Sequence, residues 1–266
     1  RKQNFLQCKQ IKTNIMKKSN CSVFLAGLLS MVAFLYSCDK SLYVTYSNYV
    51  SAYVFEESLR TIHYKSDDMN HVFRIASHDP KANFISPHST GEDKKLFEAL
   101  SVKNKDTSYN RKFIENDLDD INHSNNVFFA ERISDISIIS ETDWNSDYPA
   151  GSSLNDLFLF LSCSPDAYIL NGYKKVITES YITTESIDVR LQDLLSWTNA
   201  NSGDTTTPIY GVLSDIEFEK YNLLGISGII GWFAPTVLPD NPKSKMKITV
   251  TFENGKTSVL EDSLTP

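Results

Sequence analysis

The C-terminal stretch of this chain restricts its fold more than any other feature. Residues 245–252 (Lys-Met-Lys-Ile-Thr-Val-Thr-Phe) alternate strictly between polar and apolar side chains, as a strand with one buried face does. The turn Glu253-Asn254-Gly255-Lys256 follows, and residues 257–260 return. Asn-Gly between alternating segments is the strongest local signal for a β-hairpin, because both residues accept the positive φ of the turn. The sequence therefore predicts an antiparallel pair here.

The rest of the chain has a similar β-rich character. Aromatic residues make up 12% of the sequence, and Tyr, Phe, Thr and Ile recur between turn signals. Strands are predicted at 71–76, at 127–130 with 135–139 as one long or bulged strand, at 176–183 and at 209–218. Short helices are predicted at 94–100, 154–158 and 191–197, whereas 42–55 fits either a helix or a strand. We expect a mainly β protein, an antiparallel β-sandwich-like domain with a few short helices.

The N-terminal region has the pattern of a bacterial lipoprotein signal. Met16-Lys17-Lys18 supplies the positive start, residues 23–35 are mostly apolar, and Ser37 precedes Cys38. We interpret 1–15 as an over-extended gene start, 16–37 as the signal peptide and 38–266 as the mature β-rich region, with Cys38 as the lipidated residue. A plain secretory signal and a membrane anchor helix are the alternatives. The polar stretch 103–126 is a candidate internal boundary.

The charge of the mature region bears on its partners. Six of the 26 basic residues and none of the 33 acidic residues precede Cys38, so the remainder carries a formal charge of about −13. Such a chain repels nucleic acid and anionic lipid surfaces. We therefore expect no nucleic-acid partner, and membrane attachment through acyl chains on Cys38 rather than through a basic patch.

Motifs that carry chemistry are mostly incomplete. Gly255-Lys256-Thr257 ends like a phosphate-binding loop, but the first glycine of that motif is replaced by Val250. Residues 225–229 are similar to a nucleophile elbow, yet the fifth position is Ile229; a packed strand with close backbone approach explains the glycines better. The five histidines show no metal-ligand spacing, and the acid pairs 56–57, 67–68 and 119–120 are typical of charged surface. No catalytic residue, cofactor or metal site is predicted.

Two short features leave alternatives open. Asp143, Asn145 and Asp147 match the first three ligand positions of a calcium loop, but Tyr148 replaces the glycine at position six and Leu154 the acid at position twelve. These residues either bind calcium in another geometry or, as we favour, cap turns. Cys163, after Phe160-Leu161-Ser162, is predicted to be a buried small hydrophobic residue.

The signal-peptide cleavage motif (lipobox) ends at Cys38 and is followed by Asp39-Lys40. Together with the stretch from Ile136–Ser140 through Asp147–Leu157, it resembles an uncharacterised lipoprotein family of Bacteroidetes. The resemblance implies a cell-envelope, outer-membrane location, with the periplasmic or surface face undecided, and it implies no catalytic residues. Asp204-Thr205-Thr206 and Asp262-Ser263-Leu264 also look like the short O-glycosylation sites of that phylum.

The function we expect is that of a lipid-anchored binding or interaction module with a protein or glycan ligand. One alternative is an envelope hydrolase whose residues converge only in the fold, which a cleft with two or more acids of raised pKa would favour. Another is a structural subunit of a surface assembly, which an unpaired, uncharged edge strand would favour.

Overall fold

A computed structural model describes residues 43–56, 59–64, 71–77, 84–114, 126–175, 186–200 and 205–264. The chain divides into two compact units, residues 1–43 with 114–116 and residues 44–113 with 117–266. Almost all described residues belong to the second unit. No helix within the described ranges has the length and apolar character needed to cross a membrane.

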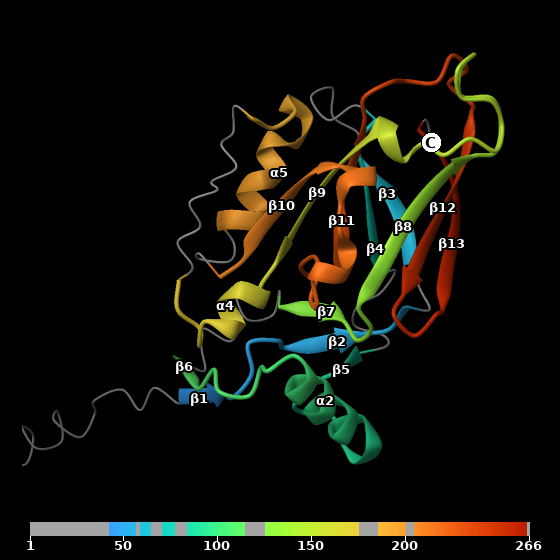
Figure 1. The fold of residues 1–266 in the computed structure, drawn as a ribbon. Helices are drawn as coiled ribbons and strands as arrows, with labels where there is room; N and C mark the ends of the chain where they lie inside the picture. Colours follow the sequence, from blue (N-terminus) through green and yellow to red (C-terminus); the bar gives the residue numbers. More distant parts are fainter. Residues whose placement is uncertain are drawn as a thin grey trace, which may run out of the picture. The chain divides into compact units, whose positions relative to one another are not determined.

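The larger sheet of the second unit has five antiparallel strands in the order β10-β9-β11-β4-β3 (Figure 1). The strands are β3 Leu59–His63, β4 Phe73–Ser77, β9 Phe158–Ser164, β10 Thr207–Val212 and β11 Ile229–Pro235. β9 and β11 are buried along almost their whole length, as central strands covered on both faces are. The strand predicted at 71–76 is confirmed. The strand predicted at 209–218 stops at Val212, where the 3₁₀ turns η6 Leu213–Asp215 and η7 Phe218–Lys220 begin.

The second sheet has three antiparallel strands in the order β13-β12-β8. The predicted hairpin is confirmed as β12 Lys245–Phe252 and β13 Thr257–Ser263, with Thr251 opposite Thr257 across the turn. The prediction of one long strand over 127–139 is wrong. β7 Val127–Phe129 and β8 Ile133–Ser140 belong to different sheets, because the chain turns at 130–132 and carries β8 across to β12.

The two sheets share one hydrophobic core. β8 and β12 contribute Ile136, Ile138, Ile248 and Val250, and the five-stranded sheet contributes Phe73, Phe158, Phe160 and Phe233, all fully buried. The rings of Phe73 and Phe233 stack with their centroids 5.1 Å apart. Alternating side chains of both sheets thus meet between two layers, and the expected mainly β, antiparallel sandwich-like fold is confirmed.

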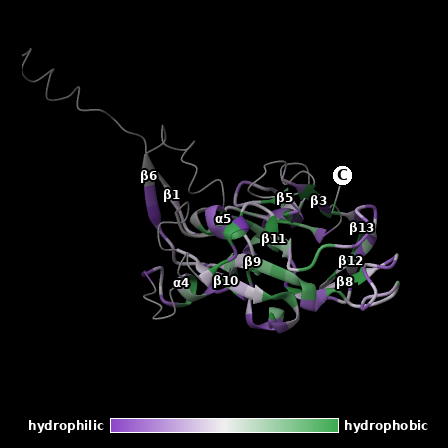
Figure 2. Ribbon diagram, turned by 90° about the horizontal axis from the view of Figure 1, so that it is seen from above, coloured by the Kyte–Doolittle hydropathy of each residue, from purple (hydrophilic) through white to green (hydrophobic). Residues whose placement is uncertain are grey.

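A helix covers the outer face of the larger sheet. α5 Val189–Ala200, longer than the predicted 191–197, packs Leu191, Leu194 and Leu195 against a second cluster that includes Cys163 and Trp232. Figure 2 shows the hydrophobic residues concentrated along the strands beneath α5, whereas β6 is hydrophilic. The larger sheet is therefore covered on both faces, which explains why β9 and β11 lack polar–apolar alternation.

A third cluster closes one end of the second unit. It is rich in tyrosine and joins α2 Gly91–Lys103 and α4 Asp166–Leu170 to a sheet of β5 Phe84–Ile85, β2 Ala52–Val54 and β7. β2 and β7 are parallel, unlike the strand pairs of the two larger sheets, which are all antiparallel. β1 Tyr43–Tyr46 pairs with β6 Arg111–Ile114. The ambiguous stretch 42–55 thus forms strands, and the predicted strand 176–183 lies outside the described residues.

The open edge of β8 is occupied by a side chain. Asn155, in the 3₁₀ turn Asn155–Leu157, accepts a hydrogen bond from the Ile138 N–H (2.8 Å) through Oδ1 and donates one to the Ile136 carbonyl (3.1 Å) through Nδ2. The Leu154 N–H donates to the Ile138 carbonyl (2.8 Å). The amide of Asn155 therefore takes the place of a neighbouring strand, a device that protects an exposed sheet edge.

Candidate functional site

The loop that resembles a calcium site is a set of turns closed by its own side chains. Asp143 Oδ1 accepts a hydrogen bond from the Ala150 N–H (2.8 Å). Asn145 Oδ1 accepts from the N–H groups of Asp147 (3.0 Å) and Tyr148 (3.1 Å). The turn-capping interpretation thus agrees with the geometry. Within the described ranges, no group of three or more His, Cys, Asp or Glu side chains is placed to hold a metal ion.

This loop instead forms one wall of a surface hollow of about 440 Å³. Residues 240–241 form the opposite wall; the lining residues are Thr142, Asp143, Trp144, Asn145, Ser146, Asp240 and Asn241. Trp144 is fully buried, and its Nε1–H donates to the Val237 carbonyl (3.1 Å) while its own carbonyl accepts from the Asp240 N–H (2.8 Å). Trp144 therefore fixes the two walls relative to each other.

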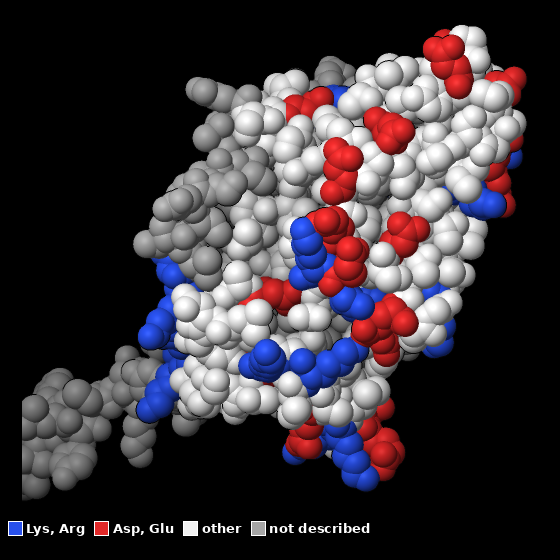
Figure 3. All heavy atoms as spheres, viewed as in Figure 1, with Lys and Arg blue, Asp and Glu red and all other residues white. Residues whose placement is uncertain are grey.

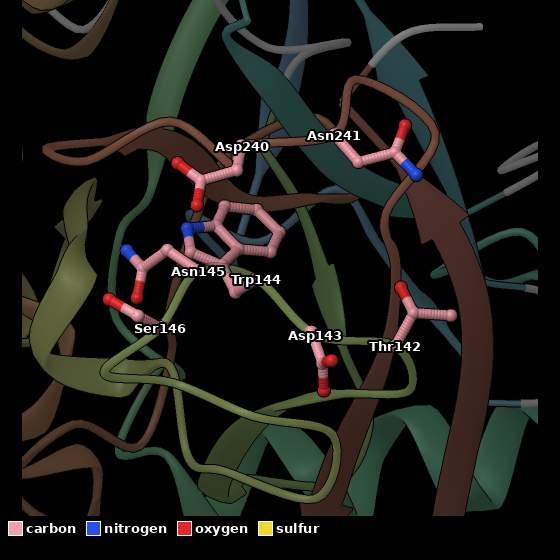
Figure 4. A pocket seen from close by; sticks show the side chains of 7 residues that line it. All are labelled: Thr142, Asp143, Trp144, Asn145, Ser146, Asp240 and Asn241. Atoms are coloured by element: carbon pink, nitrogen blue, oxygen red, sulfur yellow. The ribbon is translucent and has the colours of Figure 1, made fainter.

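The polar side chains of the hollow divide into two sets. Figure 4 shows Asp240, Asn145 and Ser146 with their polar ends on one side of Trp144, whereas Asp143 points away from them. Thr142 accepts the Lys245 N–H (3.0 Å), as Asn241 accepts that of Lys243 (3.0 Å). Ser146 Oγ and the Asp240 carboxylate have no such bond to another described residue. These two groups are free to bind a ligand.

A second polar cluster joins the tips of several elements. Glu253, in the hairpin turn, pairs with Lys103 and with Arg132 (3.5 Å), and Glu131 lies 3.9 Å from Lys103. Glu56 at the end of β2 is 5% exposed and pairs with Lys256 (2.5 Å). In Figure 3 acidic and basic side chains intermix in the central part of the visible face. The cluster ties the hairpin to α2, β2 and the β7–β8 turn.

The pKa shifts in this cluster follow from its pairing. Burial would raise the pKa of Glu253, but Lys103 and Arg132 outweigh it and hold the pKa below its usual value. Glu56 behaves in the same way through Lys256. Burial, with the nearby Glu253, raises the pKa of Glu131 although Lys103 opposes this. Only one of the three acids has a raised pKa, and each is held by an ion pair, so this cluster is not the cleft with raised acids that a hydrolase would need.

The other residues singled out in the sequence have structural positions or are not described. Cys38, His78, His123 and the acid pairs 67–68 and 119–120 lie outside the described residues. Cys163 is fully buried as predicted, and burial raises the pKa of its thiol to about 12. His63 of β3 is largely buried, and its Nε2 lies 2.8 Å from Asp262 of β13, so this pair joins the edges of the two sheets. A Cβ on Gly231 would lie 2.4 Å from the Phe160 ring, which confirms the predicted close approach.

A buried carboxylate at Asp106 has no signal in the sequence. This residue is 0% exposed, and its side chain accepts hydrogen bonds from the N–H groups of Tyr49 (2.7 Å) and Val50 (2.8 Å) and from the Tyr173 hydroxyl (2.9 Å). Burial raises the pKa of Asp106 although these bonds oppose the shift. Asp106 lies in the polar stretch 103–126, whose composition is typical of a loop or boundary. In the structure its carboxylate instead holds the tyrosine-rich cluster together.

No known protein family, curated protein or solved structure matches the chain.

Proposed function

We propose that this chain is a lipid-anchored protein of the bacterial cell envelope, held in the outer membrane through Cys38, that binds a hydroxyl-rich ligand such as a glycan. The observation that carries the binding proposal is the hollow, in which Ser146 and Asp240 face the same space with no bond to another described residue. The pattern of Lys17, Lys18 and Cys38 supports the anchor.

The chemistry of the hollow suits a neutral polar ligand. The Asp240 carboxylate accepts hydrogen bonds, the Ser146 hydroxyl both donates and accepts, and Asn145 keeps its Nδ2 donors because Oδ1 caps the turn. Such a set matches neighbouring hydroxyl groups of a sugar, which donate and accept in turn. The volume of about 440 Å³ lies within the range of small-ligand sites. The buried Trp144 supplies a rigid floor and no stacking surface.

Binding is tested on a glycan array with the full-length chain, followed by calorimetry with the glycans that bind. The double variant Ser146→Ala with Asp240→Ala removes both uncommitted groups. Loss of two hydrogen bonds, one of them to a charged group, is expected to weaken affinity about 30-fold or more. The matched control is Ser214→Ala with Asp215→Ala, two exposed residues outside the hollow. Equal binding by wild type and the hollow variant would contradict the assignment of this site.

The anchor is tested separately by metabolic labelling with an alkyne fatty acid, comparing wild type with Cys38→Ala. Label on the wild type alone is the expected result. Label on neither protein would remove the anchor from the proposal, and the hollow would then be tested as part of a secreted protein.

A further inference from the structure

Four exposed basic residues lie on segments that meet at the end of the second unit that carries β6. They are Lys105, Arg111, Lys112 and Lys174, which we call the basic end. Contacts through tyrosines bring these segments together: Arg111 donates to the Tyr173 carbonyl (3.2 Å), and Tyr109 packs on the ring of Tyr173 at 5.2 Å. Lys174 directly follows Tyr173, and Lys105 precedes Asp106, which accepts a hydrogen bond from the Tyr173 hydroxyl. Segments about 60 residues apart in the sequence thus converge here.

The basic end contrasts with the acidic character of the whole chain. Within 105–112 and 170–175 the sole acid is Asp106, which is 0% exposed. The nearby Asp166 accepts the N–H groups of Asn222 (2.6 Å) and Leu223 (3.2 Å). The acids at 115–120 lie outside the described residues. Figure 3 shows basic side chains along the side of the second unit where β6 lies.

An exposed apolar side chain lies close in sequence to one of these charges. Leu170, the last residue of α4, is 58% exposed and stands four residues before Lys174. An exposed leucine on a basic surface suits contact with lipid headgroups, because the charges meet phosphates while the apolar group enters the interface.

The length of chain before β1 limits how far the proposed anchor can lie from this surface. Six residue-to-residue steps lead from Cys38 to Val44, and a fully extended chain of that length spans about 20 Å. β1 pairs with β6, which carries Arg111 and Lys112, and the Ser47 carbonyl accepts the Tyr109 N–H (2.9 Å). A lipid on Cys38 therefore keeps the membrane surface within reach of the basic end.

We propose that the basic end binds the anionic phospholipid headgroups of the membrane that holds the Cys38 lipid, a step that rests on the anchor proposed above. The net negative charge of the chain does not prevent this, because charges more than a Debye length of about 8–10 Å away are screened. This contact also orients the protein. The hollow lies beside the end of β8 and the start of β12, which Figure 1 shows far from β6, so this contact turns the hollow away from the bilayer.

The test measures lysine reactivity in the full-length lipidated chain reconstituted into vesicles. Vesicles of phosphatidylcholine alone are compared with vesicles containing about 30% phosphatidylglycerol, a strongly anionic surface. A water-soluble amine acetylating reagent is applied briefly, and mass spectrometry gives the rate at each lysine. Lys105, Lys112 and Lys174 are expected to react several-fold more slowly on the anionic vesicles, since each basic residue near such a surface contributes about a fivefold preference. Lys243 and Lys245, exposed at the other end, serve as internal controls.

A charge-reversal pair separates this contact from a structural effect. In Lys112→Glu with Lys174→Glu, the protection of Lys105 is expected to fall to its value on neutral vesicles, whereas Lys243→Glu with Lys245→Glu leaves it unchanged. Salt at about 0.5 M is expected to abolish the protection in the wild type.

Two results would overturn the proposal, and they differ. Co-flotation with neutral vesicles but equal labelling on both lipids would leave the anchor intact and overturn the contact between the basic end and anionic headgroups. Failure to co-float with either vesicle would remove the anchor itself, and the membrane contact with it.

Discussion

The burial of Asp106 leads to a quantitative prediction about stability. Asp106→Ala leaves three buried donors without acceptors: the N–H groups of Tyr49 and Val50 and the hydroxyl of Tyr173. Each unpaired buried donor costs about 1–3 kcal/mol. Removal of a buried carboxylate returns part of this, since burial is what raises the pKa of Asp106. We expect the free energy of unfolding to fall by about 3–5 kcal/mol, a large share of the roughly 5–15 kcal/mol typical of a folded domain.

The measurement is urea unfolding of the full-length chain followed by tryptophan fluorescence. With an m-value of about 2–3 kcal/mol per M, the midpoint is expected to fall by about 1–2.5 M. Asp215→Ala, at an exposed position, is the matched control and is expected to change the free energy by less than about 0.5 kcal/mol. A loss below about 1 kcal/mol for Asp106→Ala would refute the reasoning that the three bonds are buried and needed.

Three further predictions concern the sheets and one surface ion pair. Gly231→Ala is expected to destabilise the protein by at least about 2 kcal/mol in urea unfolding, because a Cβ would lie 2.4 Å from the Phe160 ring. Asn155→Ala is expected to cost about 1–2 kcal/mol and to speed hydrogen exchange of the Ile138 amide, because both edge bonds are lost. Arg190→Gln is expected to cost about 1–2 kcal/mol at pH 7, because Arg190 donates hydrogen bonds to the Asp188 carboxylate. These bonds lower the pKa of Asp188, so the stabilisation is lost when that carboxylate is protonated. The cost of the substitution is therefore expected to fall as the pH falls toward 3 in pH-dependent unfolding.

Each of these predictions has a matched control. A Cβ on Gly211, also in a strand of the larger sheet, would lie 3.4 Å from the nearest atom, so Gly211→Ala should have a much smaller effect than Gly231→Ala. Asn155→Asp keeps an acceptor for the Ile138 N–H, so exchange there should stay slow. Lys95→Gln breaks an exposed ion pair with Glu92 and should change stability by less than about 0.5 kcal/mol. Equal effects in a variant and its control would contradict the reason given.

Much of the fold could be predicted from the sequence because its signals are local. The hairpin at 245–260 depends on a period of two and on two residues that accept positive φ, and neither requires a distant contact. The buried nature of Cys163 follows from its apolar neighbours. The division of 127–139 into two strands of different sheets could not be predicted, because both parts are good strand sequences and only their partners differ.

The sequence by itself thus determined the β-rich class, the C-terminal hairpin and a candidate anchor at Cys38. Tertiary structure alone decided which polar residues act together. Ser146 and Asp240 are far apart in the chain but line one hollow. Trp144, in the loop of Ser146, is buried and hydrogen-bonded to the segment that carries Asp240, which holds the two loops together. Asp106 is buried, and the segments that carry Lys105, Lys112 and Lys174 converge, because tyrosines from separate segments pack there. Such convergence depends on long-range packing, which the spacing of residues along the chain does not record.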